Sequence, residues 1–201
     1  MPDNKKLNMN TTFTLRPGRP EDAPEIARLI VMAMTDECCR HFYGPNHTDA
    51  DFLRLITRLV ATTGTQYSYE NTICAVASDN GSIAGVSVSY DGARLIELRR
   101  HFIEGAILEF GIDHSAMEPE TQAGELYLDS LAVWPRYRGH GIATMLLNAT
   151  AEKARRMGCG PLGLLVDEGN PRAERLYNKV GFRYVNANTW GGHRMKHLQM
   201  E

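Results

Sequence analysis

A strand, a glycine-containing loop and a helix follow one another between positions 125 and 157, and this stretch constrains the fold most. Residues 125–133, ELYLDSLAV, have the composition of a strand. The next segment, RYRGHGIAT (136–144), places Gly139 and Gly141 one residue apart. From Gly141 to Met157, apolar side chains recur at helical spacing. A strand joined through glycines to a helix predicts the α/β class, and the helix start could receive an anion.

Two common nucleotide-binding patterns do not fit this loop. In the dinucleotide fingerprint a third glycine is required, but Thr144 stands at that position. The segment WPRYR also separates the strand from Gly139, whereas the fingerprint follows its strand directly. The Gly-Lys-Ser/Thr of a P-loop is missing as well. The loop therefore matches neither of these two patterns.

The charge around the loop favours an anion without excluding a simple turn. Residues 134–158 contain five Lys or Arg and one acid, in a chain whose net charge is −2. Three of these cations, Lys153, Arg155 and Arg156, lie near the end of the helix, where they suit the helix dipole without any ligand. From the loop alone, a phosphate site and a tight turn are both possible.

The remaining pattern predicts one mixed α/β domain over residues 12–201. Before the loop, strands are expected at 12–18, 72–78 and 82–90, with a hairpin turn at 79–81, and helices at 19–34, 48–60 and 93–110; residues 38–48 read as a loop. After it, we expect a buried strand at 162–166, a helix at 170–181 that Asn170 caps with Pro171 at its first position, and two last strands at 182–187 and 194–200.

Composition excludes several partner classes. The chain has 201 residues, of which 43% are apolar and 23% charged, so no excess of positive charge favours nucleic acid or an anionic membrane. Its longest apolar run, residues 29–34, is too short to span a bilayer. Residues 1–11 are polar and predict a flexible tail without a secretory signal. The four cysteines form no C-x-x-C and fit reduced thiols in the cytoplasm.

Two segments around the loop narrow the interpretation. Arg136, Gly139 and Gly141 satisfy the pattern Gln/Arg-x-x-Gly-x-Gly/Ala, directly after LYLDSLAV. Downstream, NPRAERLYNKVGF (170–182) fills every position of Asn-x-x-Ala-x-x-Leu-Tyr-x-x-x-Gly-Phe. In this order and spacing, the stretch 125–184 resembles the GNAT superfamily of N-acetyltransferases. The opening LRPGRPEDAPEIARLI is also similar to that family's first strand and helix.

The resemblance implies a fold and a function. The fold would be a mixed, mostly antiparallel central sheet flanked by helices and splayed between its fourth and fifth strands, with residues 91–124 as a helical insertion between the third and fourth. The protein would transfer an acetyl group from acetyl-coenzyme A to a primary amine by direct attack in a ternary complex. The alternatives are a non-catalytic acyl-coenzyme A sensor and a transferase of a longer acyl group.

The resemblance also implies where the cofactor would bind. The pyrophosphate would lie on backbone amides between Arg138 and Thr144, and the pantetheine arm would pair with the fourth strand near Leu131, whose N–H would face the thioester oxygen. The candidate cofactor-binding residues are Leu131, Ala132, Val133, Arg136, Arg138, Gly139, His140, Gly141, Ile142, Ala143, Thr144, Asn170, Ala173 and Tyr177.

Three residues are candidates for proton transfer. Tyr177 would protonate the leaving thiolate, although it also fits the apolar face of its helix. Glu125, Tyr127, Asp129 and Leu131 are expected on one face of the strand, because side chains alternate along it. Some members of the family carry a glutamate where this chain has Tyr127. That difference leaves Asp129 and Glu125 as the candidate bases.

The acceptor is a small-molecule or peptide amine of unknown identity. His41, Tyr43 and His47 fall in a loop where this family commonly forms its acceptor pocket, although such residues are usually solvated. The insertion 91–124 is expected to cover the acceptor side or to form a homodimer contact. His193 and His197 are four residues apart without a nearby acid or thiol in the sequence, so no metal site is expected.

Overall fold

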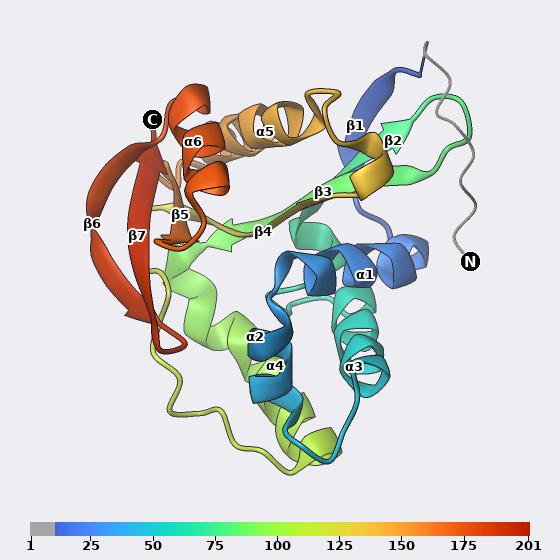
Figure 1. The fold of residues 1–201 in the computed structure, drawn as a ribbon, viewed down its shortest axis with the longest axis vertical. Helices are drawn as coiled ribbons and strands as arrows, with labels where there is room; N and C mark the ends of the chain where they lie inside the picture. Colours follow the sequence, from blue (N-terminus) through green and yellow to red (C-terminus); the bar gives the residue numbers. More distant parts are fainter. Residues whose placement is uncertain (1–10) are drawn as a thin grey trace.

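A computed structural model describes residues 11–201 (Figure 1). The flexible tail predicted for residues 1–11 lies, except for Thr11, outside the described residues. The elements in chain order are β1 (Phe13–Pro17), α1 (Ala23–Ala33), α2 (Asp36–Tyr43), α3 (Asp49–Ala61), β2 (Thr72–Ala77), β3 (Ile83–Asp91), α4 (Leu95–Phe110), β4 (Leu126–Val133), α5 (Ile142–Met157), β5 (Leu162–Asp167), α6 (Pro171–Val180), β6 (Arg183–Trp190) and β7 (His193–Met200).

The described strands form one mixed sheet in the order β1-β2-β3-β4-β5-β7-β6. Every neighbouring pair is antiparallel except β4 and β5, which are parallel. The hairpin predicted at 79–81 joins β2 to β3, where the Asn80 side chain accepts a hydrogen bond from the Ser82 amide. The predicted mostly antiparallel sheet with flanking helices is confirmed.

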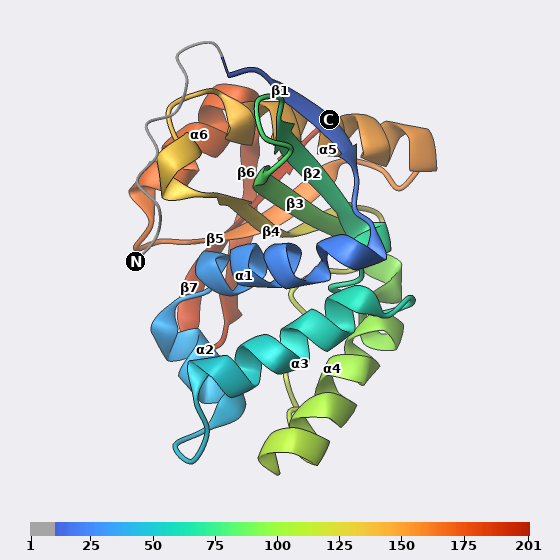
Figure 2. The same cartoon turned by 90° about the vertical axis from the view of Figure 1, so that its right-hand side faces the viewer.

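Helices cover both faces of the sheet (Figure 2). On one face, α1, α3 and α4 enclose a core that includes Ile30, Phe52 and Phe102. On the other face, α5 packs its Leu147 and Ala151 onto β4 and β5, next to α6. These apolar stripes are the helical periodicities of the sequence, and burying them is the main source of the fold's stability.

The prediction of a loop at 38–48 is wrong over its first part, where α2 runs to Tyr43. Thr35 caps this helix by accepting a hydrogen bond from the Cys38 amide, and two acids follow in its first turn. Phe42 is buried, so packing against the core stabilises a helix that is too short to form alone. Gly44, in a left-handed conformation, ends it.

The predicted splay between the fourth and fifth strands is confirmed. β4 and β5 pair only at Leu126 with Leu162 and at Tyr127 with Gly163. Beyond Tyr127 the two strands separate. On its other edge, β5 pairs with β7 along its whole length. The second half of β4 therefore has a strand neighbour on its β3 side only.

Candidate active site

The glycine loop leads into α5 with the geometry that an anion site needs. Gly139 and Gly141 have φ values of 84° and 76°, in the left-handed region that favours glycine. A β-carbon at either glycine would meet no other atom of residues 11–201 within 4 Å, so this part of the chain leaves the space before the helix open. Within residues 11–201, the amides of residues 139–144 donate to no backbone or side-chain acceptor outside the helix. Free amides at a helix start favour a negatively charged ligand.

The side chains of the loop are turned back onto the protein. The Arg138 Nε donates to the Val133 carbonyl at 3.1 Å, and the Arg136 guanidinium lies 4.9 Å from the ring centre of Tyr137. His140 Nδ1 lies 3.2 Å from the Tyr137 carbonyl, and its ring packs edge-on against Phe13. These contacts hold the loop in shape, and the candidate anion donors are the backbone amides.

A β-bulge at Asp129 reverses the side-chain alternation of β4. Val88 of β3 pairs with Ser130 and Ser89 pairs with Leu128, so Asp129 has no partner in β3. Tyr127 packs on the α4 side against Tyr90, whereas Leu131 packs on the α5 side. The expectation that Leu131 shares a face with Tyr127 is therefore wrong, because one extra residue between them shifts the parity.

The bulge and the splay together expose backbone groups of β4. Trp134 donates its amide to the Ala84 carbonyl of β3, and antiparallel strands alternate between bonded and outward-facing residues. Counting back along the register, Ala132 faces β3, while Leu131 and Val133 direct their N–H and C=O groups toward the gap with β5. An extended ligand could pair with β4 there as a strand would.

A cavity of about 390 Å³ opens beside this gap. Its wall is formed by α1, α2, α4, α6, β4, β5, β7, the β6–β7 turn, the segment 62–71 between α3 and β2, and the segment 111–124 between α4 and β4. Among the candidate residues, it brings together Asp129, Leu131, Asn170, Ala173 and Tyr177.

Asp129 is held by two hydroxyl groups at the inner end of this cavity. Tyr90 donates to its Oδ2 at 2.9 Å and Ser130 to its Oδ1 at 2.9 Å. Behind Tyr90, Arg99 of α4 and Glu120 form a buried ion pair. Burial raises the pKa of Asp129 above its ordinary value, although both hydroxyl bonds and the Arg99 charge act in the opposite direction. Asp129 is thus a fixed carboxylate with increased basicity.

Tyr177 lies on α6, the helix that Asn170 caps, and both residues line the cavity. The Asn170 side chain accepts a hydrogen bond from the Ala173 amide at 3.1 Å, which confirms Asn170 as the N-cap of α6. The Tyr177 ring packs edge-on against Phe182, 5.6 Å between centres. Burial raises the pKa of Tyr177 to about 12, and no hydrogen bond of its hydroxyl occurs among residues 11–201. The phenol therefore stays protonated, and its hydroxyl is free to donate a hydrogen bond to a ligand.

Glu125, the other candidate base, does not line the cavity. It precedes β4, and its carboxylate accepts hydrogen bonds from Gln199 at 2.9 Å and from Thr121, with His197 Nε2 at 2.7 Å. A side chain at Gly163 would collide with this carboxylate. Glu125 therefore joins β4, β5 and β7 at the closed end of the splay, which is a structural position.

We expect Glu125→Gln to destabilise the protein by about 2 kcal/mol, because it disrupts a buried pair whose partners then lack a charge-assisted bond. Burial alone would raise the pKa of Glu125, but the bonds from His197, Gln199 and Thr121 lower it overall. Its stabilisation is therefore present above the ordinary carboxyl pKa and lost as pH falls through the lowered value. Urea unfolding at several pH values measures both effects.

The matched control is Glu97→Gln, since Glu97 pairs with Arg94 at the surface of α4. An exposed pair should contribute less than about 0.5 kcal/mol. Unchanged stability in Glu125→Gln, or loss of the acidic limb of its pH–rate profile, would contradict the structural role.

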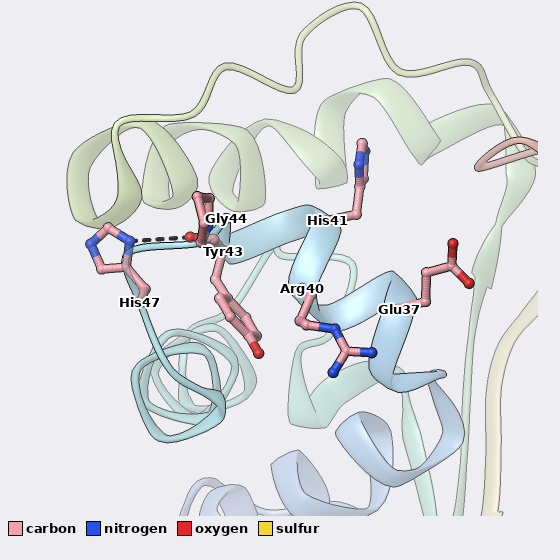
Figure 3. A pocket seen from close by; sticks show the side chains of 7 residues that line it. Glu37, Arg40, His41, Tyr43, Gly44 and His47 are labelled. Atoms are coloured by element: carbon pink, nitrogen blue, oxygen red, sulfur yellow. Dashed lines mark hydrogen bonds between the residues drawn. The ribbon is translucent and has the colours of Figure 1, made fainter.

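The predicted acceptor residues divide between two hollows. His41 lines the cavity and also an outer hollow of about 450 Å³ along α2 (Figure 3). Tyr43 and His47 line only the outer hollow, where Tyr43 donates to Asp49 at 2.8 Å and His47 Nδ1 lies 3.1 Å from the Tyr43 carbonyl. Of the three, His41 alone borders the cavity.

The two histidines of β7 point to different partners. His193 Nδ1 lies 3.2 Å from Asp167, whereas His197 contacts Glu125. Within residues 11–201, no group of three or more His, Cys, Asp or Glu side chains is placed to hold a metal ion. No helix of this part of the chain combines the length and the apolar content needed to cross a membrane.

Several residues of the cavity region are not among the sequence-based candidates, and three of them illustrate why. Tyr90 comes from β3, Glu120 from the segment 111–124 and Trp190 from the end of β6. Each is distant in sequence from the glycine loop and belongs to no recognisable pattern. For Glu120 the sequence offers one signal, the insertion 91–124, which is expected to cover the acceptor side or to form a homodimer contact.

Comparisons with known proteins agree with this geometry. The sequence model of the Acetyltransferase (GNAT) family matches residues 33–182. A structure described as that of an acetyltransferase is 30% identical, with a TM-score of 0.76 over 94% of this chain and 98% of the other. N-acetyltransferase from Staphylococcus aureus Mu50 shares the fold, with 24% identity and a TM-score of 0.78 over 93% of this chain and 100% of the other.

Curated relatives match over shorter stretches. Acetyltransferase Atu2258 of Agrobacterium fabrum is 40% identical over 67 residues, which is 33% of this chain and 47% of that protein. Thialysine N-epsilon-acetyltransferase of Mus musculus is 39% identical over 56 residues, 28% of this chain and 33% of that protein. These matches span a third to about half of the relatives' length. The family match over residues 33–182, the splayed sheet and the open glycine loop before α5 lead to one conclusion: this chain belongs to the GNAT acetyltransferase family.

Proposed function

We propose that the protein is an N-acetyltransferase that moves an acetyl group from acetyl-coenzyme A to a primary amine by direct attack in a ternary complex. The observation that carries this proposal is a single cavity lined by a fixed carboxylate, Asp129, by β4 backbone at Leu131 and by the free phenol of Tyr177. Acyl transfer to an amine needs a base, an oxyanion donor and an acid, and these three groups supply them.

The residues present fit coenzyme A. Free amides before α5, with open space at Gly139 and Gly141, suit its pyrophosphate. The outward-facing N–H and C=O groups of Leu131 and the N–H of Val133 suit the amides of the pantetheine arm, while the Val133 carbonyl already accepts a hydrogen bond from Arg138. One structural neighbour, the NatC complex, was crystallised with coenzyme A and a Gag peptide; at 19% identity and a TM-score of 0.57 it shares the fold alone.

Each residue then has a distinct role in the reaction. When bound, acetyl-coenzyme A supplies an acetyl group activated as a thioester. Asp129 accepts a proton from the amine, and Tyr90 keeps its carboxylate oriented toward the cavity. The Leu131 amide donates a hydrogen bond to the carbonyl oxygen, which gains negative charge during the attack. Tyr177 donates a hydrogen bond to the departing sulfur.

Tyr177→Phe should lower kcat about 100-fold, since it removes the donor that stabilises the leaving group. The ring stays in place against Phe182, so the affinity for coenzyme A should change less than about twofold. Steady-state kinetics and calorimetry measure the two quantities. Tyr184→Phe, an exposed tyrosine of β6, serves as the control and should behave as wild type. Full activity in Tyr177→Phe would remove Tyr177 from the mechanism.

The proposal as a whole is tested by release of the free thiol of coenzyme A from acetyl-coenzyme A in the presence of a panel of primary amines. Acceptor-dependent release with acetylated amine as the second product is the expected result. Tight binding of acetyl-coenzyme A without release, across a broad panel, would contradict it and indicate a sensor. Faster release from a longer acyl thioester would contradict only the choice of acetyl.

A further inference from the structure

The charge of the cavity wall is unbalanced. Within residues 11–201, its lining includes four carboxylates and no lysine or arginine. The carboxylates come from α2, the segment 111–124, β4 and β5: Glu37, Glu120, Asp129 and Asp167. Arg99 pairs with Glu120 from behind, and the histidines of the wall are His41 and His193. A ligand carboxylate would meet like charges here without a basic side chain to bind it.

A buried oxygen atom of the wall has no donor. Gln66 is 3% exposed, and its Oε1 has no hydrogen-bond partner within the described residues. Leaving a buried acceptor unpaired is costly, so a donor on the ligand would be favoured. The aromatic rings of Tyr67, Phe102 and Tyr127 line the same cavity. Oxygen acceptors beside aromatic faces form an environment suited to an ammonium group.

Contacts of α2 with the β6–β7 turn and with the segment 111–124 enclose part of the cavity. The ring of Trp190, at the β6–β7 turn, lies 6.4 Å from the ring of Phe42 on α2, and Figure 1 shows these two elements close together. His114 of the segment 111–124 has its Nε2 3.0 Å from the Phe42 carbonyl. These contacts join three elements around the cavity, and its 390 Å³ must also hold the thioester. The space suits a small molecule better than a polypeptide.

We propose that the acceptor is a small aliphatic diamine without a carboxylate group. This inference rests on the proposed function, because it names the substrate of the same site. One nitrogen loses its proton to Asp129 and attacks. The second remains an ammonium group and donates to the acidic, aromatic wall of the cavity, where Gln66 Oε1 lacks a donor. An amino acid would bring its carboxylate into a wall of like charge.

Three acceptors of the same chain length test each part of this proposal. 1,5-Diaminopentane carries both nitrogens, pentylamine lacks the second one, and lysine adds a carboxylate. Calorimetry with protein saturated by coenzyme A gives their affinities without requiring turnover, and thiol release gives kcat/KM. We expect 1,5-diaminopentane to exceed lysine by at least about tenfold in both, with pentylamine between them.

A charge reversal at the rim supplies the matched test. Glu37 is exposed, forms no hydrogen bond or ion pair among residues 11–201 and lines the cavity, so Glu37→Lys should leave the fold intact. The variant should reduce the preference for 1,5-diaminopentane over lysine, in affinity and in kcat/KM, at least threefold. Glu104→Lys makes the same charge change on the exposed face of α4 and should leave this preference unchanged.

The outcomes separate the two proposals. Lysine or a peptide amine bound as tightly as 1,5-diaminopentane, or no binding of any of the three amines, overturns the diamine. Binding in the expected order without any thiol release supports the diamine site and overturns acetyl transfer. Equal effects of Glu37→Lys and Glu104→Lys would show that net charge, and not the cavity wall, sets the preference.

Discussion

Replacing Gly141 by leucine should weaken coenzyme A binding at least about 100-fold while the protein stays folded. The glycine has a φ of 76° and stands directly before α5, and no atom of the described part of the chain lies within 4 Å of the position that a β-carbon would take. A leucine side chain would therefore project into the open space where the pyrophosphate is proposed to bind. Its left-handed backbone would also cost about 1–2 kcal/mol in the free energy of unfolding. Calorimetry with coenzyme A measures the affinity, and urea unfolding the stability.

Gly158 offers a matched control at the other end of the same helix. It has a φ of 66° and equally open surroundings, so Gly158→Leu carries a similar backbone strain far from the loop. We expect the two variants to lose similar stability, but only Gly141→Leu to lose coenzyme A. Equal affinity in both variants would mean that the amides before α5 do not bind the cofactor.

The second large effect is expected at Asp129, where asparagine should lower kcat by about 10²- to 10⁴-fold. Asparagine is isosteric and can still accept the hydrogen bond from Tyr90, so the cavity should keep its shape. It cannot accept the proton of the amine. The affinity for coenzyme A should be unchanged, which calorimetry checks. Near-normal kcat in Asp129→Asn would show that water or another group is the base.

The pH–rate profile should also show the role of Asp129 as a base. A base must be deprotonated to act, so wild-type activity should fall as pH drops through the pKa of Asp129, which burial raises. Asp129→Asn should lack this limb and keep the one that belongs to the acceptor amine. Tyr90→Phe removes a bond to the charged form, and should therefore move the limb to higher pH.

Tyr127→Phe is the control for that shift. Its ring lies 5.9 Å from the ring of Tyr90 and it lines the same cavity, but its hydroxyl makes no hydrogen bond to Asp129 among the described residues. The acidic limb of this variant should stay where the wild type has it. A limb that moves equally in both variants would indicate a general change of the cavity and contradict the specific role of Tyr90.

Much of this fold could be predicted from local patterns. The turn before Ser82, the stripe of α5 and the Asn170 cap depend on neighbours a few residues away, and each is confirmed. Thr35 and the two acids after it signal the start of α2, but the Gly-Pro-Asn segment that follows favours a loop, so the sequence predicts a loop where the helix lies. The helix signal at Thr35 and the loop signal after Tyr43 conflict, and the packing of Phe42 against the core, which the sequence does not show, decides for the helix.

The candidate site was predictable only in part. Asp129 and Tyr177 line one cavity, whereas Glu125 lies outside it at the closed end of the splay, bonded to His197. Simple strand alternation also predicts that Leu131 shares a face with Tyr127, which the bulge at Asp129 prevents. A bulge is a property of two strands, since it depends on how Ser89 and Val88 pair across to β4, so the sequence of β4 alone does not reveal it. Tyr90, Glu120 and Trp190 reach the cavity region through contacts distant in sequence.

The class of the fold, the family and a glycine-rich helix start at Gly139 and Gly141 can be derived from the chain alone, because they depend on short-range periodicity and motif spacing. The open space before α5, the carboxylate that faces the cavity, the groups that hold this carboxylate and the charges of the cavity wall depend on how distant segments pack. Those properties of the cavity arise where β3, β4, α2 and the segment 111–124 meet, and burial there sets the pKa of Asp129.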